Sequence, residues 1–303
     1  MTQTGSTDLT VVGAGPAGVA ATLMAVSVGM SVRLVEQGVP GGKLHHIGAL
    51  DNVPGDWHSG PDLAAALSSD LDRARATQLL YRTTGRATAV AGYDGHAEVT
   101  LADGTVHRSE AVVVATGVTT LSAAAAPWIE APDGFSPSPL WRTDPAALRG
   151  PTWILGADRP LGTWLRAHPH VEHTLNVACP PGDDYKSVEV EGDPRVHLVR
   201  CAALAVAPAP SGGAGLQLTV RGRDGRESLH VAGTVLHNLG SRPATLDGLA
   251  QGPDGYCPPE LQHPRILTAG DLRSARFQRV VTAQGSGAQA ALARYYDIAL
   301  TGD

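Results

Sequence analysis

The feature that most constrains the fold of this chain is a glycine turn near its start. A short β-branched run at residues 9–12 leads into GAGPAG at residues 13–18, and an alanine-rich stretch follows to about residue 30. A second apolar run at residues 31–35 ends in Glu36. This order is typical of a dinucleotide-binding βαβ unit: a strand, a tight turn, a helix, and a second strand that ends in an acid about 20 residues after the glycines.

Each position of the turn has a physical role in such a site. Gly13 permits the tight turn, Gly15 lets backbone N–H groups approach a pyrophosphate, and Gly18 lets the helix pack closely on the strand. The helix N-terminus adds a partial positive charge, and Glu36 would accept a hydrogen bond from a ribose hydroxyl. A glycine turn with a purely structural role has no need of the acid at this spacing, so we predict a dinucleotide site.

Composition and charge exclude several classes of protein. With 303 residues the chain is long enough for two ordinary domains, and 43% hydrophobic with 17% charged residues is a globular composition. No apolar run approaches the roughly 20 residues of a membrane helix. The net charge of −6, with scattered basic residues, argues against nucleic-acid binding. The N-terminus lacks the pattern of a signal peptide, so we expect a cytoplasmic protein that binds neither membrane nor nucleic acid.

Three further segments carry a resemblance to a known family. Residues 40–55 read PGGKLHHIGALDNVPG, residues 111–117 read AVVVATG, and residues 265–287 read RILTAGDLRSARFQRVVTAQGSG. Together with the first turn, they resemble the low-molecular-weight thioredoxin reductase family of flavoproteins, nearly end to end. The resemblance implies an α/β fold of two doubly wound, Rossmann-like domains and a homodimer. The FAD domain would be split between residues 1–121 and 241–303, with an NAD(P)H-type domain inserted at residues 122–240.

The resemblance also implies how the cofactor FAD is held. The first glycine turn would hold the pyrophosphate, Glu36 the adenosine ribose, and Asp271 the ribityl chain. A helix from Val280 to about residue 300 would place its N-terminus against the flavin pyrimidine edge. Residue propensity alone does not distinguish this role of Asp271 from that of a helix cap. The residues assigned to FAD are Gly13, Ala14, Gly15, Pro16, Ala17, Gly18, Glu36, Gln37, Gly42, Lys43, Leu44, Asn52, Arg86, Ala87, Ala115, Thr116, Gly117, Gly270, Asp271, Arg279 and Val280.

The middle of the chain departs from the family at its second glycine turn. A strand at residues 152–155 leads into GADRPLG at residues 156–162, where Asp158 stands in place of the second glycine. A carboxylate about 4 Å from a pyrophosphate charge is repelled by roughly 4 kcal/mol at an effective dielectric near 20. Arg159 would offset part of this, whereas Pro160 lacks an N–H for an anion.

The following strand, at residues 174–178, also lacks what NADPH needs. It leads to CPPGDD at residues 179–184, where the resembled family has a basic pair for the 2′-phosphate. Loss of a charge-assisted contact and gain of a repulsion each reduce affinity. We therefore expect this NAD(P)H-type domain to be degenerate.

The redox disulfide of the family is also missing. Residues 136–143 read SPSPLWRT where the family carries C-x-x-C, and serine forms neither a thiolate nor a disulfide. The three cysteines, Cys179, Cys201 and Cys257, stand far apart, with no spacing typical of a metal site. Cys179 is a candidate loop thiol, although a buried cysteine reads the same. Reduction of thioredoxin by a dithiol is excluded.

Candidate catalytic residues follow directly after the segment expected at the flavin. His45 and His46 are imidazoles that titrate near neutral pH, so either is a candidate base for a substrate proton, or a surface side chain. Trp141 and Arg142 would cover the flavin or anchor an anion, or simply pack between domains.

Three functions remain open. The first is an FAD-dependent oxidase or dehydrogenase that acts on a small-molecule or carrier-protein-tethered substrate, which can bear a thiol, in natural-product biosynthesis, with electrons passed to O2. The second is a flavin reductase fed by ferredoxin or NAD(P)H. The third is a non-catalytic partner protein stabilised by FAD. The intact flavin segments beside two eroded ones favour the first.

Overall fold

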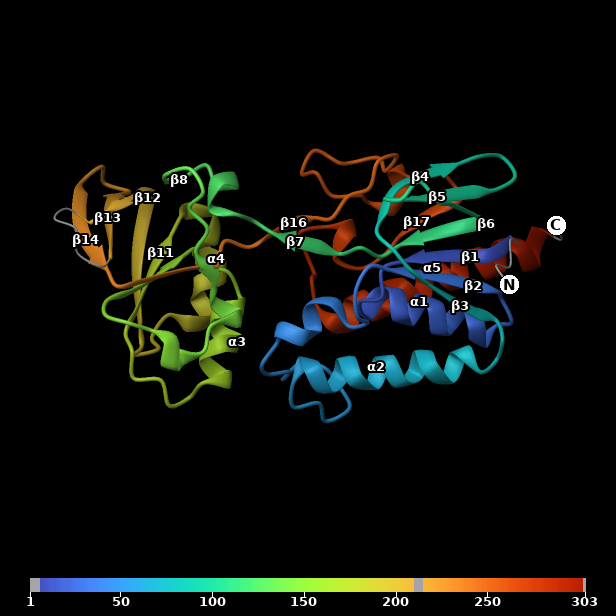
Figure 1. The fold of residues 1–303 in the computed structure, drawn as a ribbon, viewed down its shortest axis with the longest axis horizontal. Helices are drawn as coiled ribbons and strands as arrows, with labels where there is room; N and C mark the ends of the chain where they lie inside the picture. Colours follow the sequence, from blue (N-terminus) through green and yellow to red (C-terminus); the bar gives the residue numbers. More distant parts are fainter. Residues whose placement is uncertain (1–5, 210–214, 302–303) are drawn as a thin grey trace. The chain divides into compact units, whose positions relative to one another are not determined.

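The computed structural model describes residues 6–209 and 215–301. Two units are distinguished by their internal contacts, and their elements are labelled in Figure 1. The first unit comprises residues 1–45, 50–119 and 242–303, and the second comprises residues 46–49 and 120–241. The division points lie within two residues of the domain boundaries drawn from the sequence. The exception is the short stretch 46–49, which the sequence places in the first domain and the structure in the second unit.

The first unit is built on a mixed sheet with the strand order β3-β2-β1-β6-β5-β4, in which β17 also pairs with β6. β1, β2, β3, β6 and β17 are parallel, whereas β4 and β5 form an antiparallel extension. The bounds are β1 Thr7–Val12, β2 Val32–Glu36, β3 Leu80–Thr84, β4 Ala87–Gly92, β5 Ala97–Leu101, β6 Val106–Val114 and β17 Ile266–Thr268.

Three helices cover one face of this sheet (Figure 1), namely α1 Pro16–Ser27, α2 Gly60–Arg75 and α5 Val280–Thr301. α2 begins where Ser59 caps it, since the Ser59 hydroxyl accepts from Asp62 N–H at 3.3 Å. α1 and α5 pack closely because Gly287 has no side chain, and a Cβ there would run into the carbonyl of Ala17. This contact brings the start of α5 toward the start of α1.

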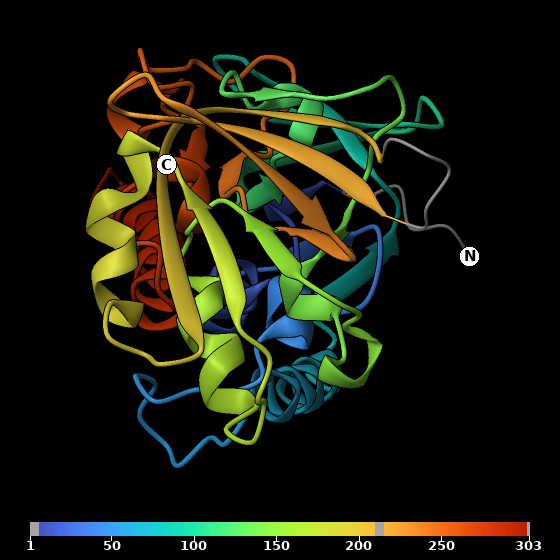
Figure 2. The same cartoon turned by 90° about the vertical axis from the view of Figure 1, so that its left-hand side faces the viewer.

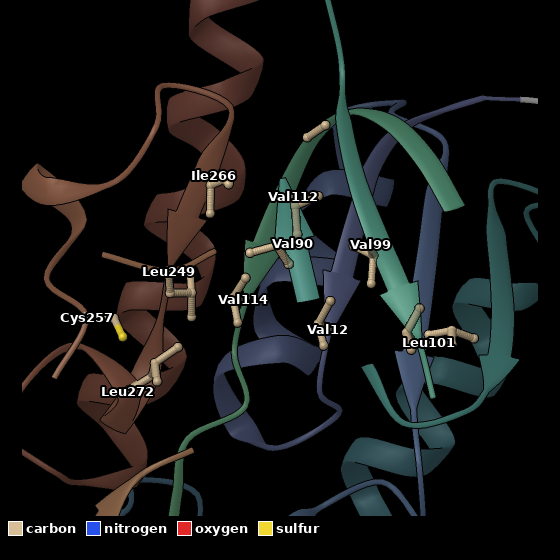
Figure 3. Packing of buried hydrophobic residues seen from close by; sticks show 12 residues of the cluster. Val12, Val90, Val99, Leu101, Val112, Val114, Leu249, Cys257, Ile266 and Leu272 are labelled. Atoms are coloured by element: carbon tan, nitrogen blue, oxygen red, sulfur yellow. The ribbon is translucent and has the colours of Figure 1, made fainter. Parts of the chain in front are cut away.

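One buried apolar cluster of the first unit joins side chains of β1, β4, β5, β6 and β17 with side chains from the segments on either side of β17. Figure 3 shows Val12, Val112 and Val114 packed with Leu272 and Cys257, all of them buried. Cys257 is therefore a small apolar side chain of this cluster. The same core supports the carboxyl ends of β1, β6 and β17.

The second unit contains a separate sheet with the order β14-β13-β12-β11-β10-β15-β9, in which β8 also pairs with β12. β9 to β12 and β15 are parallel, while β13 and β14 extend β12 as an antiparallel hairpin, coloured orange in Figure 2. Its strands are β8 Ile129–Glu130, β9 Ser138–Pro139, β10 Thr152–Leu155, β11 Leu175–Cys179, β12 Val196–Pro208, β13 Leu216–Gly222, β14 Glu227–Ala232 and β15 Thr234–His237. Its helices are α3 Pro160–Ala167 and the single turn α4 Asp184–Ser187.

Apart from the short stretch 46–49, the chain passes between the units through β7 Val118–Thr120 and β16 Ser241–Pro243. These two strands pair with each other. The second unit therefore interrupts the sequence of the first, as the family resemblance implies.

Candidate functional site

The predicted FAD-binding segments meet at one edge of the first sheet. β1, β2, β6 and β17 are parallel, so their carboxyl ends lie on the same side. The glycine turn follows β1, Glu36 ends β2, Ala115 follows β6, and Gly270 follows β17 by one residue. The carboxyl edge of a parallel sheet is where open α/β folds bind ligands.

The glycine turn has the geometry that a dinucleotide requires. Gly13 has a φ of +97°, and a Cβ there would lie 2.6 Å from the carbonyl oxygen of Ala115. A Cβ on Gly18 would run into the carbonyl of Gly13, whereas one on Gly15 would meet nothing within 4 Å. Gly13 and Gly18 are therefore needed by the fold, and Gly15 keeps open space at the start of α1, which is what the approach of a pyrophosphate needs.

The carboxylate of Glu36 lies at this turn. Glu36 Oε2 accepts from the N–H of Ala14 at 2.6 Å, and Oε1 accepts from the N–H of Gly38 at 2.8 Å. The backbone carbonyl of Glu36 accepts from Gly85 N–H at 3.0 Å, so Arg86 follows directly beside the end of β2. The acid and the turn thus form one local arrangement.

The segment after β2 folds back onto the same turn. Gly41 N–H donates to the carbonyl of Ala14 at 2.8 Å, and a Cβ on Gly42 would lie 3.7 Å from the Cα of Gly15. Leu44 is buried below it, in the short 3-10 helix Gly42–His46. Lys43 is therefore held close to the open side of the glycine turn.

A charged group of three side chains comes from three separate segments. Burial raises the pKa of Asp271, while the positive charges of Lys43 and Arg279 act on it in the opposite direction. Gly270 fixes the backbone here, because a Cβ on it would lie 2.8 Å from that of Ala17. The two cations and the half-buried acid are a suitable donor and acceptor set for a polar chain that crosses the sheet edge.

The start of α5 also reaches this region. Ser286 Oγ accepts from Gly270 N–H at 2.8 Å, which ties α5 to the end of β17. Thr282 Oγ1 accepts from Arg279 N–H at 3.2 Å. The Val280 N–H is then the first donor of the helix proper that the helix itself leaves unsatisfied.

The remaining residues predicted to bind FAD make contacts within the fold or are exposed. Thr116 Oγ1 donates to the carbonyl of Ala244 at 2.7 Å, and Gly117 O accepts from Ala244 N–H at 3.0 Å, so this segment anchors the returning chain. Gln37 and Asn52 are exposed. Ala87 begins β4, one residue after Arg86.

The two candidate histidines differ in their hydrogen bonds. His45 Nε2 lies 2.8 Å from the carbonyl oxygen of Pro40. Because a carbonyl only accepts, Nε2 carries the proton and the lone pair of the neutral ring is on Nδ1. His46 Nε2 lies 2.8 Å from Arg142 Nη2. Because a guanidinium only donates, Nε2 of His46 is an acceptor and is already occupied.

The segment that replaces the family's dithiol supplies that arginine. Leu140, Trp141 and Arg142 form a single 3-10 turn, and Leu140 is fully buried. Trp141 makes an edge contact with His237 at 5.4 Å between ring centroids. His46, Arg142, Trp141 and His237 all belong to the second unit.

The three cysteines are free and buried. Burial raises the pKa of Cys201 to about 11 and also raises the pKa values of Cys179 and Cys257. Thiols in this state are poor nucleophiles. The alternative of a reactive loop thiol at Cys179 is therefore wrong, since that residue lies buried at the end of β11.

The second glycine turn differs from the account that the sequence favours. Asp158 pairs with Lys186 at 3.0 Å, whereas the Arg159 guanidinium lies 5.9 Å from the ring centroid of Tyr185. Pro160 is no defect, because it opens α3 just as Pro16 opens α1 in the first unit. Sequence reasoning missed Lys186, although it is one of only two lysines in the chain.

Solved structures with this arrangement identify the fold. The chain superimposes on thioredoxin reductase from Lactococcus lactis with a TM-score of 0.77, over 97% of this chain and 99% of that one, at 17% sequence identity. The chain has the thioredoxin reductase fold. Thioredoxin reductase from T. acidophilum matches with a TM-score of 0.72 and 19% identity, over 96% of this chain and 98% of that one. The prediction of an α/β fold with two doubly wound domains is confirmed.

The sequence comparisons add a shorter match. A thioredoxin reductase from Listeria monocytogenes is 38% identical over 63 residues, which are 20% of this chain and 20% of that relative's length. No protein-family model matches the chain. In the part of this chain that the structure describes, no helix is long and apolar enough to cross a bilayer.

Proposed function

We propose that this protein is an FAD-dependent oxidase or dehydrogenase that works without NADPH and without a redox disulfide. Its substrate is a small molecule or an intermediate tethered to a carrier protein in natural-product biosynthesis, and this substrate class includes thiols. Its electron acceptor is O2. The protein acts as a homodimer. The observation that supports this most is the contrast between the two turns: the first is open at Gly15, and the second is filled by the chain's own charged side chains.

The first unit fits FAD by the chemistry of its donors. Gly15 leaves open space at the start of α1, and Glu36 offers a carboxylate to a ribose. Lys43, Asp271 and Arg279 bring two donors and one acceptor to the edge where the ribityl chain and flavin would lie. When bound, FAD would supply a two-electron acceptor for the substrate hydride, and O2 would take up the two electrons and two protons and leave as H2O2.

His45 is the better candidate for the base that takes the proton that the substrate loses together with the hydride. Its Nε2–H is held by the carbonyl of Pro40, so the basic lone pair is on Nδ1 and the exposed ring is free to receive a proton there. The same carbonyl stabilises the imidazolium that forms, because it accepts a hydrogen bond from a cationic donor.

His46 is better suited to positioning. Arg142 occupies its Nε2, and a proton arriving at that atom would break this hydrogen bond and place two cations side by side. Arg142 stands in the segment that replaces the dithiol. Its contact with His46 gives this segment a structural role that needs no sulfur chemistry. The two histidines therefore have different proposed roles.

The direct test of the cofactor is the visible spectrum of the purified protein. We expect flavin absorption, release of FAD on denaturation, and no bleaching by NADH or NADPH under argon. A colourless protein that does not take up added FAD would refute the cofactor. Rapid bleaching by either nucleotide would instead establish the reductase alternative.

The test of the reaction uses candidate donors. Compounds are screened for flavin bleaching under argon and for peroxide in air, with free thiols and carrier-bound thioesters among them. His45→Gln should retain FAD and lower the rate of bleaching at least roughly tenfold, the usual scale for loss of a general base. His46→Gln is the matched control and should retain most of the rate. Tight binding to another protein with no turnover of any donor would indicate the non-catalytic alternative.

A further inference from the structure

Three charged side chains fill the second glycine turn. Lys186 Nζ lies 3.0 Å from Asp158 Oδ1 and 3.0 Å from Asp183 Oδ1. The exposed fractions of the three side chains are 18%, 20% and 11% for Lys186, Asp158 and Asp183, so water reaches them only in part. The residue in the place of the second glycine is therefore neutralised from within the protein.

The turn nevertheless keeps the layout of the first unit. Gly156 has a φ of +92°, close to the +97° of Gly13, and both are too near a neighbouring carbonyl for a side chain. Ala157 N–H donates to Asp183 Oδ2 at 2.9 Å, as Ala14 N–H donates to Glu36 Oε2 at 2.6 Å. Asp183 thus occupies the position of the acid that faces a ribose.

Asp158 is fixed in place by the adjoining strand end. Asn238 Nδ2 donates to the carbonyl of Asp158 at 2.6 Å, and Asp158 N–H donates to the carbonyl of Asn238 at 3.3 Å. Asn238 is fully buried, and its Oδ1 has no hydrogen-bond partner in the part of the chain that the structure describes. A Cβ on Gly240 would lie 3.6 Å from both Asp158 Oδ2 and Lys186 Nζ. The ion pair is therefore confined between α4 and the end of β15.

We propose that Asp158, Lys186 and Asp183 form an ionic latch that excludes dinucleotides from the second unit. A pyrophosphate entering this turn would have to draw Lys186 away from Asp158 and would then face an unpaired carboxylate. We further propose that the turn beneath the latch suits a dinucleotide with a free 2′-hydroxyl. Asp183 accepts from a hydroxyl and repels a 2′-phosphate.

The latch deepens the proposed function, because it accounts for the expected lack of reaction with NADH and NADPH. It is tested by binding alone, through calorimetric titration of the flavin-loaded protein at low salt with either nucleotide. Asp158→Gly removes the blocking carboxylate and leaves Lys186 paired with Asp183 alone. Asp158→Asn keeps the shape of the side chain but not its charge. Asp224→Gly, in the β13–β14 turn, removes an exposed acid from the same unit and serves as the matched control.

We expect no binding by the unaltered protein or by the Asp224→Gly variant. Asp158→Gly should bind NADH, at least tenfold more tightly than NADPH, and Asp158→Asn should show the same order with weaker binding. Binding of either nucleotide by the unaltered protein would refute the latch. Failure of both Asp158 variants to bind would refute it as well, and a preference for NADPH would refute the assignment of Asp183. A colourless preparation would refute the proposed function but not the latch, which the same titration still reads.

Discussion

Replacement of Lys186 by methionine should destabilise the second unit by an amount that depends on pH. The methionine keeps the length of the apolar stem but removes the ammonium group between Asp158 and Asp183. The two carboxylates, each 3.0 Å from Nζ, would then lie at most about 6 Å apart. At an effective dielectric near 20 their repulsion is about 3 kcal/mol. This agrees with the lower end of the cost expected when one partner of a buried ion pair is removed.

The pH dependence follows from the sign of the shift. With the lysine gone, each carboxylate raises the pKa of the other in the folded state, so the folded variant binds a proton more readily than the unfolded chain. Its loss of stability should be about 3 kcal/mol at pH 8 and should shrink toward roughly 1 kcal/mol at pH 5.

The assay is urea unfolding followed by fluorescence and circular dichroism at pH 8, 6.5 and 5. Addition of Asp158→Asn to Lys186→Met should restore most of the stability, since one of the two repelling charges is removed. Arg226→Met, which breaks an exposed ion pair with Asp224, should change stability by less than about 0.5 kcal/mol. The reasoning is refuted if Lys186→Met behaves like Arg226→Met at pH 8, or if its loss is the same at all three pH values.

Three further predictions concern the first unit and the thiols. Gly15→Ala should change the free energy of unfolding by no more than about 1 kcal/mol, yet weaken FAD binding at least roughly tenfold in a fluorescence titration. Gly18→Ala should instead lower the free energy of unfolding. Equal effects of the two variants on this free energy would contradict these roles. In FAD-free protein, burial raises the pKa of Asp271, so the unaltered chain should gain stability relative to Asp271→Asn as the pH falls from 7 to 5, and parallel pH curves would refute this. Native protein should react slowly with a chromogenic disulfide at pH 8. The reason is that burial raises the pKa of Cys201 to about 11 and raises the pKa values of the other two cysteines above their usual range. After unfolding, three thiols should react. Rapid reaction of two thiols in the native state would contradict the buried placement.

The first turn shows how much of this site is legible in the sequence. Gly13, Gly15, Gly18 and Glu36 lie within 24 residues, and their spacing alone predicts strand, turn, helix and acid. Such short-range patterns depend on backbone conformation and on which glycines the turn tolerates. In the structure Gly13 and Gly15 lie between β1 and α1, Gly18 lies in the first turn of α1, and the Glu36 carboxylate accepts from the Ala14 N–H.

The histidines show where sequence reasoning ends. His45 and His46 are adjacent and look equivalent, yet one bonds to a carbonyl five residues away and the other to Arg142, 96 residues away. Which nitrogen is free depends on partners that the chain brings together only on folding. Local propensity carries no information about such a contact.

The sequence by itself predicted the two-domain α/β architecture, the glycine turn at residues 13–18 and the lack of a dithiol, because glycine spacing, strand-ending acids and missing cysteines are properties of short segments. Only the tertiary structure decided that Lys186 pairs with Asp158, that Pro160 opens α3, and that the charges of Lys43 and Arg279 act on Asp271. These outcomes depend on which strand ends become neighbours in the sheets, and hence on contacts between residues far apart in the chain.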